Sequence, residues 1–242
     1  DACCGEQCEL SRRLRRSLLP PTIPILPGLD IAASYVAGGR GVDIGGDWSS
    51  VIGVGEEGFA FVVGDVSGHG IDAVAEMARA RFTLRAYLVD GNCAATALEK
   101  CSHQFDVATD GHIITVLVGV GNWRTGEVTI ANAGHPLPLL VTEEDTSFVP
   151  MRVGPPLGAG PGSYDSSTFT LSVGATLLVY TDGLVERRGE SLDAGLERLQ
   201  QTAHAVGARP LPELLGEVLT SMRDEGTADD IALLLVETMS ND

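Results

Sequence analysis

The sequence predicts an α+β layered fold in which two β-sheets pack together and helices cover the outside. Three observations support this prediction. Short apolar strand-like segments succeed one another in an antiparallel rhythm, helical segments come in consecutive pairs, and 44% of the 242 residues are hydrophobic. Regular alternation of single strands and helices would instead indicate a parallel sheet. We expect one domain, because a chain of this length and composition can bury one sizeable core.

The N-terminal segment is expected to form a helix from Glu6 to Leu19. Its leucines at positions 10, 14 and 18 share one helical face, arginines lie between them, and Pro20 and Pro21 end the helix. We therefore assign residues 1–21 to an N-terminal helical linker and residues 22–242 to the folded domain. Because the first residue is Asp1 rather than Met, we expect this end to be a boundary within a longer polypeptide.

The remaining elements are expected in the following order. Strands are predicted at residues 31–36, 51–54, 59–63, 113–120, 128–132, 137–141, 148–153, 167–171, 176–180 and 231–237. Helices are predicted at residues 71–89, 94–105, 192–206 and 211–223, where apolar side chains recur every three or four positions. The uninterrupted apolar run at 176–180 is typical of a strand that is buried on both faces.

The charge of the chain argues against two classes of partner. Sixteen Lys and Arg residues against 33 Asp and Glu residues leave a formal charge of -17, which repels nucleic acid and anionic membranes. The sequence contains no apolar run of about 18 residues and no signal-peptide pattern. We expect a cytoplasmic protein with neither a nucleic-acid nor a membrane partner.

The five cysteines do not indicate a disulfide framework. They are an odd number, three of them crowd into the first eight residues, and the other two are Cys93 and Cys101. The Cys-Cys-x3-Cys segment lacks a suitably spaced fourth ligand, so a zinc site there is disfavoured.

Acidic residues lie at the ends of apolar strands or in glycine-rich turns beside them. They are Asp47, Asp65, Asp182 and the pair Asp229 and Asp230. Taken singly, an Asp-Gly pair is equally typical of an ordinary turn. Carboxylates at the ends of neighbouring strands can converge on one edge, where they repel one another and are costly to bury unless they hold cations. A ligand set of oxygen atoms favours Mg²⁺ or Mn²⁺ over zinc.

The order and surroundings of these acids resemble those of the type 2C metal-dependent serine/threonine protein phosphatases, and more narrowly the SpoIIE- and RsbU-like bacterial branch. The matching motifs are GGDW (45–48), GDVSGHG (64–70), ANAGHP (131–136), GPPLG (154–158), YTDGLVE (180–186) and DDIAL (229–233). The resemblance covers roughly residues 10–238, and six ordered motifs are far more specific than one short pattern.

The resemblance implies an α-β-β-α sandwich with two Mn²⁺ or Mg²⁺ ions at a catalytic site formed by four aspartates. Asp65 would bridge the two ions, with the Val66 carbonyl on one of them. Asp47 would reach the first ion directly or through water, and Asp182 and Asp229 would hold the second. Two such ions activate a water for in-line attack on phosphorus, so no phosphoenzyme is needed. Consistently, the sequence has no Cys-x5-Arg nucleophile loop.

Several positions leave their roles open. Asp230 stands where many relatives have Asn. We interpret His69 and His135 as structural, although a proton donor at His69 and a place near the metal edge at His135 stay open. At Ser50 relatives commonly carry an acid, and we expect Ser50→Asp to raise the Mn²⁺ affinity if that side chain faces the site.

The resemblance also implies partners. The substrate of this branch is a phosphorylated regulatory protein, usually an anti-sigma-factor antagonist acting in stress responses, and a sensor domain commonly precedes the linker. We expect the leucine face of the 6–19 helix to dock on the phosphatase body or on a second copy in a homodimer, and a passive linker is an equal alternative.

Two other function classes compete with this interpretation. A non-catalytic binding module of the same fold is disfavoured because Asp65 and Asp182 are both present. A metal-dependent hydrolase of a small phosphoester would use the same ligands. Nucleotide binding has no support, because the sequence contains neither a P-loop nor a dinucleotide glycine fingerprint.

Overall fold

The computed structural model describes residues 18, 23–38, 45–207, 209–223 and 229–239. Two five-stranded antiparallel sheets form its centre. The first sheet has the order β1 (Leu29–Val36), β10 (Ile231–Thr238), β9 (Thr176–Tyr180), β6 (Leu139–Val141) and β7 (Thr146–Phe148). The second has the order β2 (Trp48–Val54), β3 (Gly58–Val66), β4 (Ile114–Asn122), β5 (Glu127–Ala133) and β8 (Ser166–Thr170).

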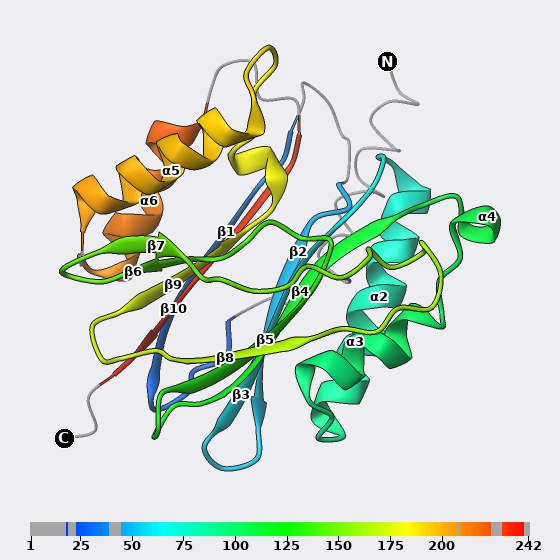
Figure 1. Ribbon diagram of the computed structural model, residues 1–242, viewed down its shortest axis with the longest axis horizontal. Helices are drawn as coiled ribbons and strands as arrows, with labels where there is room; N and C mark the ends of the chain where they lie inside the picture. The colour runs from blue at the N-terminus through cyan, green and yellow to red at the C-terminus, as the bar shows by residue number, and fades with distance from the viewer. Residues whose placement is uncertain (1–17, 19–22, 39–44, 208, 224–228, 240–242) are drawn as a thin grey trace, which may run out of the picture.

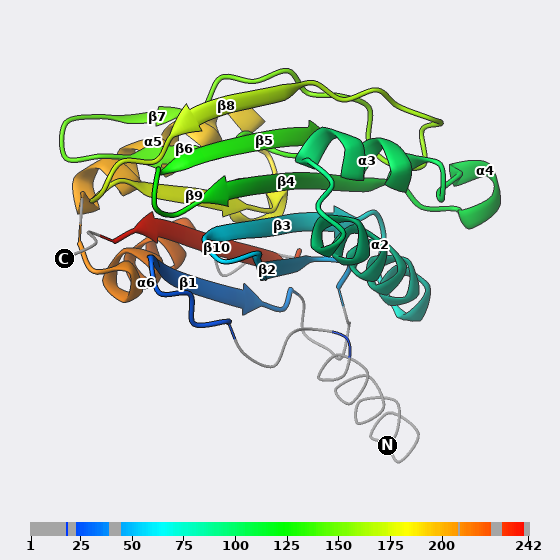
Figure 2. The same cartoon turned by 90° about the horizontal axis from the view of Figure 1, so that it is seen from below.

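Helices cover the outer face of each sheet. Helices α5 (Leu192–Val206) and α6 (Leu211–Met222) pack on the first sheet, and α2 (Ile71–Val89) and α3 (Ala94–Ser102) pack on the second (Figure 1). The short helices α4 (Val107–Asp110) and η1 (Asp182–Leu184) follow α3 and β9. Helix α4 lies beyond the end of the strands at which β4 begins (Figure 2). The predicted α-β-β-α arrangement is confirmed.

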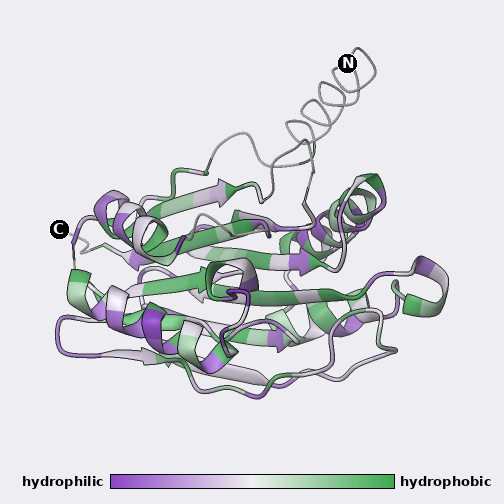
Figure 3. Cartoon of the chain, turned by 90° about the horizontal axis from the view of Figure 1, so that it is seen from above, coloured by the Kyte–Doolittle hydropathy of each residue, from purple (hydrophilic) through white to green (hydrophobic). Residues whose placement is uncertain are grey.

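The alternation of side chains along β3 shows how the layers are joined. Phe59, Phe61 and Val63 enter the core between the two sheets, whereas Ala60 and Val62 enter the core beneath α2 and α3. Because both faces of the strand are buried, it reads as an unbroken apolar run rather than as an alternation of polar and apolar residues. The strands are accordingly the most hydrophobic part of the molecule (Figure 3).

The predicted helices at 71–89 and 192–206 match α2 and α5 residue for residue. The strand predicted at 148–153 is wrong beyond its first residue, because β7 ends at Phe148. Pro150 follows closely and has no N–H group to donate to a neighbouring strand. The helix predicted to reach residue 105 ends at Ser102, and helix α4 was not predicted, although Asp106 caps it by accepting a hydrogen bond from the Ala108 N–H at 3.0 Å.

Four strand ends meet at one edge of the sandwich. The pairing of Trp48 with Gly64 places the start of β2 beside the end of β3, and the pairing of Leu233 with Tyr180 places the start of β10 beside the end of β9. The edge is held together across the two sheets because Thr181, directly after β9, hydrogen-bonds the residue directly before β2. The motif residues are thereby gathered from distant parts of the chain.

The N-terminal linker lies almost wholly outside the described residues. Of the predicted helix at 6–19 only Leu18 is described, and it packs against the core beneath α2 and α3. The boundary between residues 21 and 22 therefore stays a prediction. Among the residues that the structure describes, no helix has the length and apolarity needed to cross a membrane.

Candidate active site

Asp47 and Asp65 lie side by side at this edge. Asp47 directly precedes β2, Asp65 is the second-last residue of β3, and their carboxyl groups share a hydrogen bond. Asp47 is only 2% exposed, and the Thr181 hydroxyl donates to its Oδ2 at 2.6 Å. Asp65 is half-buried, and two carboxyl groups in contact at such a site can ionise together only at a high cost in free energy.

The pKa values of this pair follow from that environment. Burial, and after it the charge of Asp65, raises the pKa of Asp47 well above its ordinary range. Burial also raises the pKa of Asp65, against the hydrogen bond from Asp47, and the charges of Asp229 and Asp230 raise it further. The pair therefore retains a proton to a higher pH than isolated aspartates would.

Asp182 and Asp229 belong to the same electrostatic group. Burial raises the pKa of Asp182 to about 7, and the charges of Asp65, Glu186 and Asp229 contribute to this shift. Asp229 is exposed and accepts a hydrogen bond at Oδ1 from the Asp230 N–H at 2.8 Å. The structure thus brings Asp65 within electrostatic reach of each of the other three predicted aspartates, with Asp47 in direct contact.

Glycines let the acidic segments approach one another. A Cβ atom on Gly46 would lie 2.4 Å from the Val66 carbonyl oxygen, and one on Gly45 would lie 1.3 Å from Oδ2 of Asp230. Any side chain at either position would collide with these groups. Asp230 is 8% exposed and its Oδ1 accepts a hydrogen bond from the Gly38 N–H at 2.8 Å, so it joins the segment after β1 to the start of β10.

The chemistry of these donors suits a hard divalent cation. All are carboxylate or carbonyl oxygens. Burial, and after it neighbouring negative charges, raise the pKa values of Asp47, Asp65 and Asp182, and a bound cation would compensate those charges. In their present positions, no three or more His, Cys, Asp or Glu side chains of the described residues are arranged to hold an ion. A cation bound at this edge must therefore complete its coordination with water or backbone oxygens, or draw the carboxylates closer.

The two motif histidines have different surroundings. His135 is buried, its Nδ1 lies 3.0 Å from the Thr115 hydroxyl, and its main-chain N–H and C=O bond the Asn132 side chain. Burial lowers the pKa of His135 to about 3, so the ring is neutral. His69 is exposed, and its backbone forms a bridge with Gly45.

Ser50 does not face the acidic edge. Its side chain is buried beneath α2 and accepts a hydrogen bond from Arg81 Nε at 2.9 Å. Because side chains alternate along β2, Ser50 shares the helix-covered face with Trp48 and Ile52. The condition on which Ser50→Asp was expected to raise the Mn²⁺ affinity therefore fails.

Two polar residues of this region were not singled out from the sequence. Thr181 holds the Asp47 carboxyl group, and Glu186 adds negative charge near Asp182. Both belong to the YTDGLVE motif, so their closeness to Asp182 in the sequence could have identified them as residues of the site.

Comparisons with known proteins agree with this geometry. The model of the family described as Stage II sporulation protein E (SpoIIE) matches residues 55–239. Protein IcfG of Synechocystis sp. (strain ATCC 27184 / PCC 6803 / Kazusa) is 24% identical over 229 residues, which are 82% of this chain and 36% of that protein. The chain thus spans little more than a third of the length of this curated relative.

Two solved structures resemble the fold closely. The RsbU and RsbW domains of Rv1364c from Mycobacterium tuberculosis match with a TM-score of 0.82 and 34% identity over 91% of this chain and 62% of that one. The PP2C phosphatase domain of SpoIIE from Bacillus subtilis, solved with a fragment of its regulatory domain, matches with a TM-score of 0.73 and 19% identity over 88% of this chain and 62% of that one. The present chain thus spans less than two thirds of either solved chain.

Proposed function

The chain belongs to the SpoIIE family of type 2C-like serine/threonine protein phosphatases, and on this premise we propose that it dephosphorylates phosphoserine or phosphothreonine of a regulatory protein with two divalent cations. The observation that carries the proposal is the meeting of Asp47, Asp65, Asp182 and Asp229 at one edge of the sandwich. The proposed substrate is a phosphorylated anti-sigma-factor antagonist, as in the branch that the motifs resemble, and the proposed location is the cytoplasm.

Each residue has a proposed part in holding the cations. Asp65 would contribute to holding both ions, the Val66 carbonyl and Asp47 would hold the first, and Asp182 and Asp229 would hold the second. When bound, two Mn²⁺ or Mg²⁺ ions lower the pKa of a water and compensate the negative charge of the phosphoryl oxygens. Asp47 is oriented for this part by the Thr181 hydroxyl, and Gly46 leaves the Val66 carbonyl uncovered by a side chain.

The hydrogen bond between Asp47 and Asp65 has a consequence for cation binding. In the absence of cations this pair retains a proton to a higher pH than isolated aspartates would, and a carboxylate must lose its proton before it can serve as a ligand. Binding therefore releases a proton, and the cation affinity falls as the pH is lowered.

The proposal has two further parts. A sensor domain precedes the linker, and the linker docks on the phosphatase body. Docking on the body is supported by Leu18, which packs against the core beneath α2 and whose carbonyl accepts a hydrogen bond from Arg81 Nη1 at 2.5 Å. Docking on a second copy, in a homodimer, is the other arrangement that the leucine face allows.

A phosphatase assay tests the proposed function. Phosphorylated antagonist domains and p-nitrophenyl phosphate are each incubated with the protein in Mn²⁺, in Mg²⁺ and in EDTA. We expect metal-dependent release of phosphate and turnover of the phosphoproteins with a higher kcat/KM than the small ester. Hydrolysis of the small ester alone would favour a phosphatase of small molecules, and activity that persists in EDTA would contradict the two-metal mechanism.

A further inference from the structure

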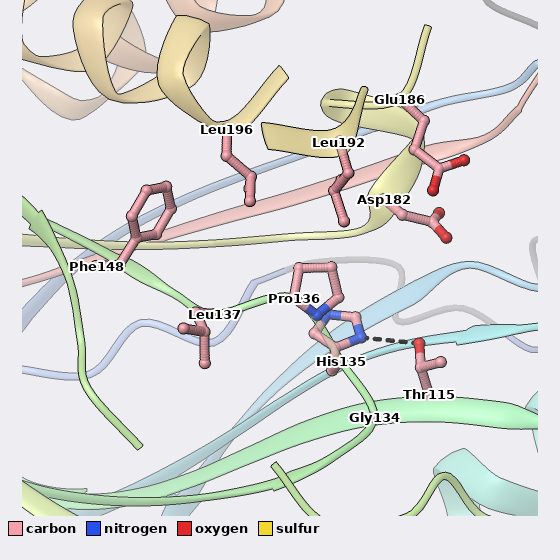
Figure 4. A pocket seen from close by; sticks show the side chains of 10 residues that line it. All are labelled: Thr115, Gly134, His135, Pro136, Leu137, Phe148, Asp182, Glu186, Leu192 and Leu196. Atoms are coloured by element: carbon pink, nitrogen blue, oxygen red, sulfur yellow. Dashed lines mark hydrogen bonds between the residues drawn. The ribbon is translucent and has the colours of Figure 1, made fainter. Parts of the chain in front are cut away.

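A cavity of about 410 Å³ lies beside the acidic edge, between the loop that follows β5 and the start of α5. Its lining has two chemically different ends. Two acidic residues lie at one end and three apolar residues at the other, with Leu192 and the His135–Pro136 segment between them (Figure 4). The acidic residues are Asp182 and Glu186, and the apolar ones are Leu137, Phe148 and Leu196.

The apolar part of the lining is accessible and firmly supported. Leu192 is 49% exposed although it is a large apolar residue. It begins α5, whose first turn is capped by Ser191, which accepts a hydrogen bond from the Ala194 N–H at 3.3 Å. Phe148 and Leu196 pack against the core between the first sheet and α5. A preformed concave site with apolar walls and a few polar groups is typical of a ligand site.

Asp182 connects this cavity to the proposed chemistry, since it is both a proposed cation ligand and part of the cavity lining. A phosphoserine bound over the acidic edge therefore places its neighbouring residues at the mouth of the cavity. An extended peptide advances about 3.3 Å per residue, so a side chain within about three positions of the phosphoserine can reach the apolar end. Glu186, at the acidic end, disfavours an acidic residue in that stretch of the substrate.

We propose that this cavity receives a bulky apolar side chain of the phosphoprotein substrate, within about three residues of the phosphoserine, and thereby sets the sequence preference of the enzyme. The inference rests on the proposed function, because the phosphoserine must bind at the acidic edge. It adds a second recognition element, which a small phosphate ester cannot use.

A peptide series tests the inference. Phosphoserine peptides of alanine and lysine carry a single Leu at each position from -3 to +3, and kcat/KM is measured in Mn²⁺ relative to the peptide without Leu. We expect one or two positions at which Leu raises kcat/KM about tenfold, since a buried apolar group in a substrate pocket typically gives discrimination of that size or more. An increase below about twofold at all positions would overturn the inference.

Variants locate the preference in the cavity. In Leu192→Ser, and in Leu196→Ala as a second variant, the ratio of kcat/KM for the Leu and Ala peptides should fall from about ten to about one. Val89→Ser is the matched control, because Val89 is 57% exposed, ends α2 and does not line the cavity, and the ratio should stay near ten. Retention of the full ratio in both cavity variants would overturn the proposal.

Two further measurements separate this inference from the proposed function. If neither p-nitrophenyl phosphate nor any peptide is hydrolysed, the proposed function fails. The dissociation constants of the fluorescently labelled Leu and Ala peptides, measured by anisotropy, then decide the inference, and equal constants would overturn it. Light scattering that shows a dimer lost in Leu192→Ser would also overturn it, because a second copy would then occupy the cavity.

Discussion

The acidic edge and the underside of α2 both bury polar groups close to strand β2, yet the hydrogen-bond partners of these groups differ. At the edge, the carboxyl groups of Asp47 and Asp65 are in contact, and burial and neighbouring charges raise their pKa values. Beneath α2, Arg81 is 8% exposed, and its guanidinium donates hydrogen bonds to the Ser50 hydroxyl and the Leu18 carbonyl. At the edge, acidic groups contact one another. Beneath α2, burial and then the charge of Arg85 lower the pKa of Arg81, but its guanidinium donates to neutral acceptors.

The difference indicates which region serves the fold and which serves function. Satisfied buried hydrogen bonds stabilise the folded state, because loss of one partner leaves the other without compensation for lost water. Crowded carboxylates destabilise the folded state unless a cation binds, so their presence is better explained by a ligand than by stability. Substitutions in the two regions should therefore change stability in opposite directions.

The largest effect is expected from neutralising Asp65. Asp65→Asn should lower kcat by at least about a hundredfold, because even residues that only support a metal ligand contribute about 10–100-fold. In EDTA the same variant should melt at a higher temperature than the wild type, since one of the repelling charges is gone. Steady-state kinetics in saturating Mn²⁺ and thermal melts in EDTA measure the two effects. If Asp65→Asn kept the turnover of the wild type, the assignment of Asp65 to the catalytic site would be wrong.

Chelation tests the same edge without a substitution. EDTA should abolish activity, and added Mn²⁺ or Mg²⁺ should restore it and raise the melting temperature, because an ion that binds only the folded state stabilises it. Differential scanning fluorimetry across a metal titration follows the stabilisation. A melting temperature that is independent of metal would contradict the compensation of these carboxylates by a cation.

The Arg81 side chain should show the opposite behaviour. Arg81→Met keeps much of the apolar stem but removes the donors to Ser50 and Leu18, so the free energy of unfolding should fall by about 1–3 kcal/mol. The stability loss of Arg81→Met should be equal in EDTA and in Mn²⁺, whereas the stability change of Asp65→Asn should depend on metal. Urea denaturation in EDTA and in Mn²⁺ measures the free energy of unfolding of this variant. If Arg81→Met were more stable than the wild type in EDTA only, it would behave like Asp65→Asn, and the two regions would not differ.

The pH dependence of stability should depend on Asp182. Its pKa is raised by burial to about 7 in the folded state, from an ordinary value of 3.8. The folded state therefore binds this proton more tightly, so the stability of the metal-free wild type is lost progressively as the pH rises from about 4 to about 7. In EDTA, Asp182→Asn should melt close to the wild type at pH 4 and increasingly above it towards pH 7. If the difference in melting temperature between the two proteins stayed constant with pH, groups other than Asp182 would cause the pH dependence of stability.

The smallest effect on metal binding is expected at position 50. Because Ser50 faces Arg81 beneath α2, Ser50→Asp adds a carboxylate beside a guanidinium rather than beside the cations. The apparent Mn²⁺ dissociation constant should change by less than about twofold, since the new charge is paired and turned from the site. Isothermal titration with Mn²⁺ measures this, and a tenfold tighter affinity would mean that the carboxylate reaches the acidic edge after all.

The local spacing of apolar residues was sufficient to predict many of the helices and strands. The spacing of apolar residues in 71–89 and 192–206 predicted the full extent of α2 and α5, because an amphipathic helix is encoded within a few turns of the chain. The end of β7 did not follow from the local pattern. Strand β7 ends at Phe148, close to Pro150, which has no N–H to offer to a neighbouring strand, whereas the apolar residues at 149, 151 and 153 favoured a longer strand.

By itself the sequence determined the layered fold class, most of its helices and strands, and the aspartates that mark one edge, because these depend on residue type, short spacing and motif order. Only the tertiary structure decided what each side chain faces. Thr181 and Asp47 are 134 positions apart, and their hydrogen bond follows from how two sheets pack. Ser50 turns to Arg81, and the cavity beside Asp182 joins a loop after β5 to α5, because strand register and layer packing bring together segments that no local pattern connects.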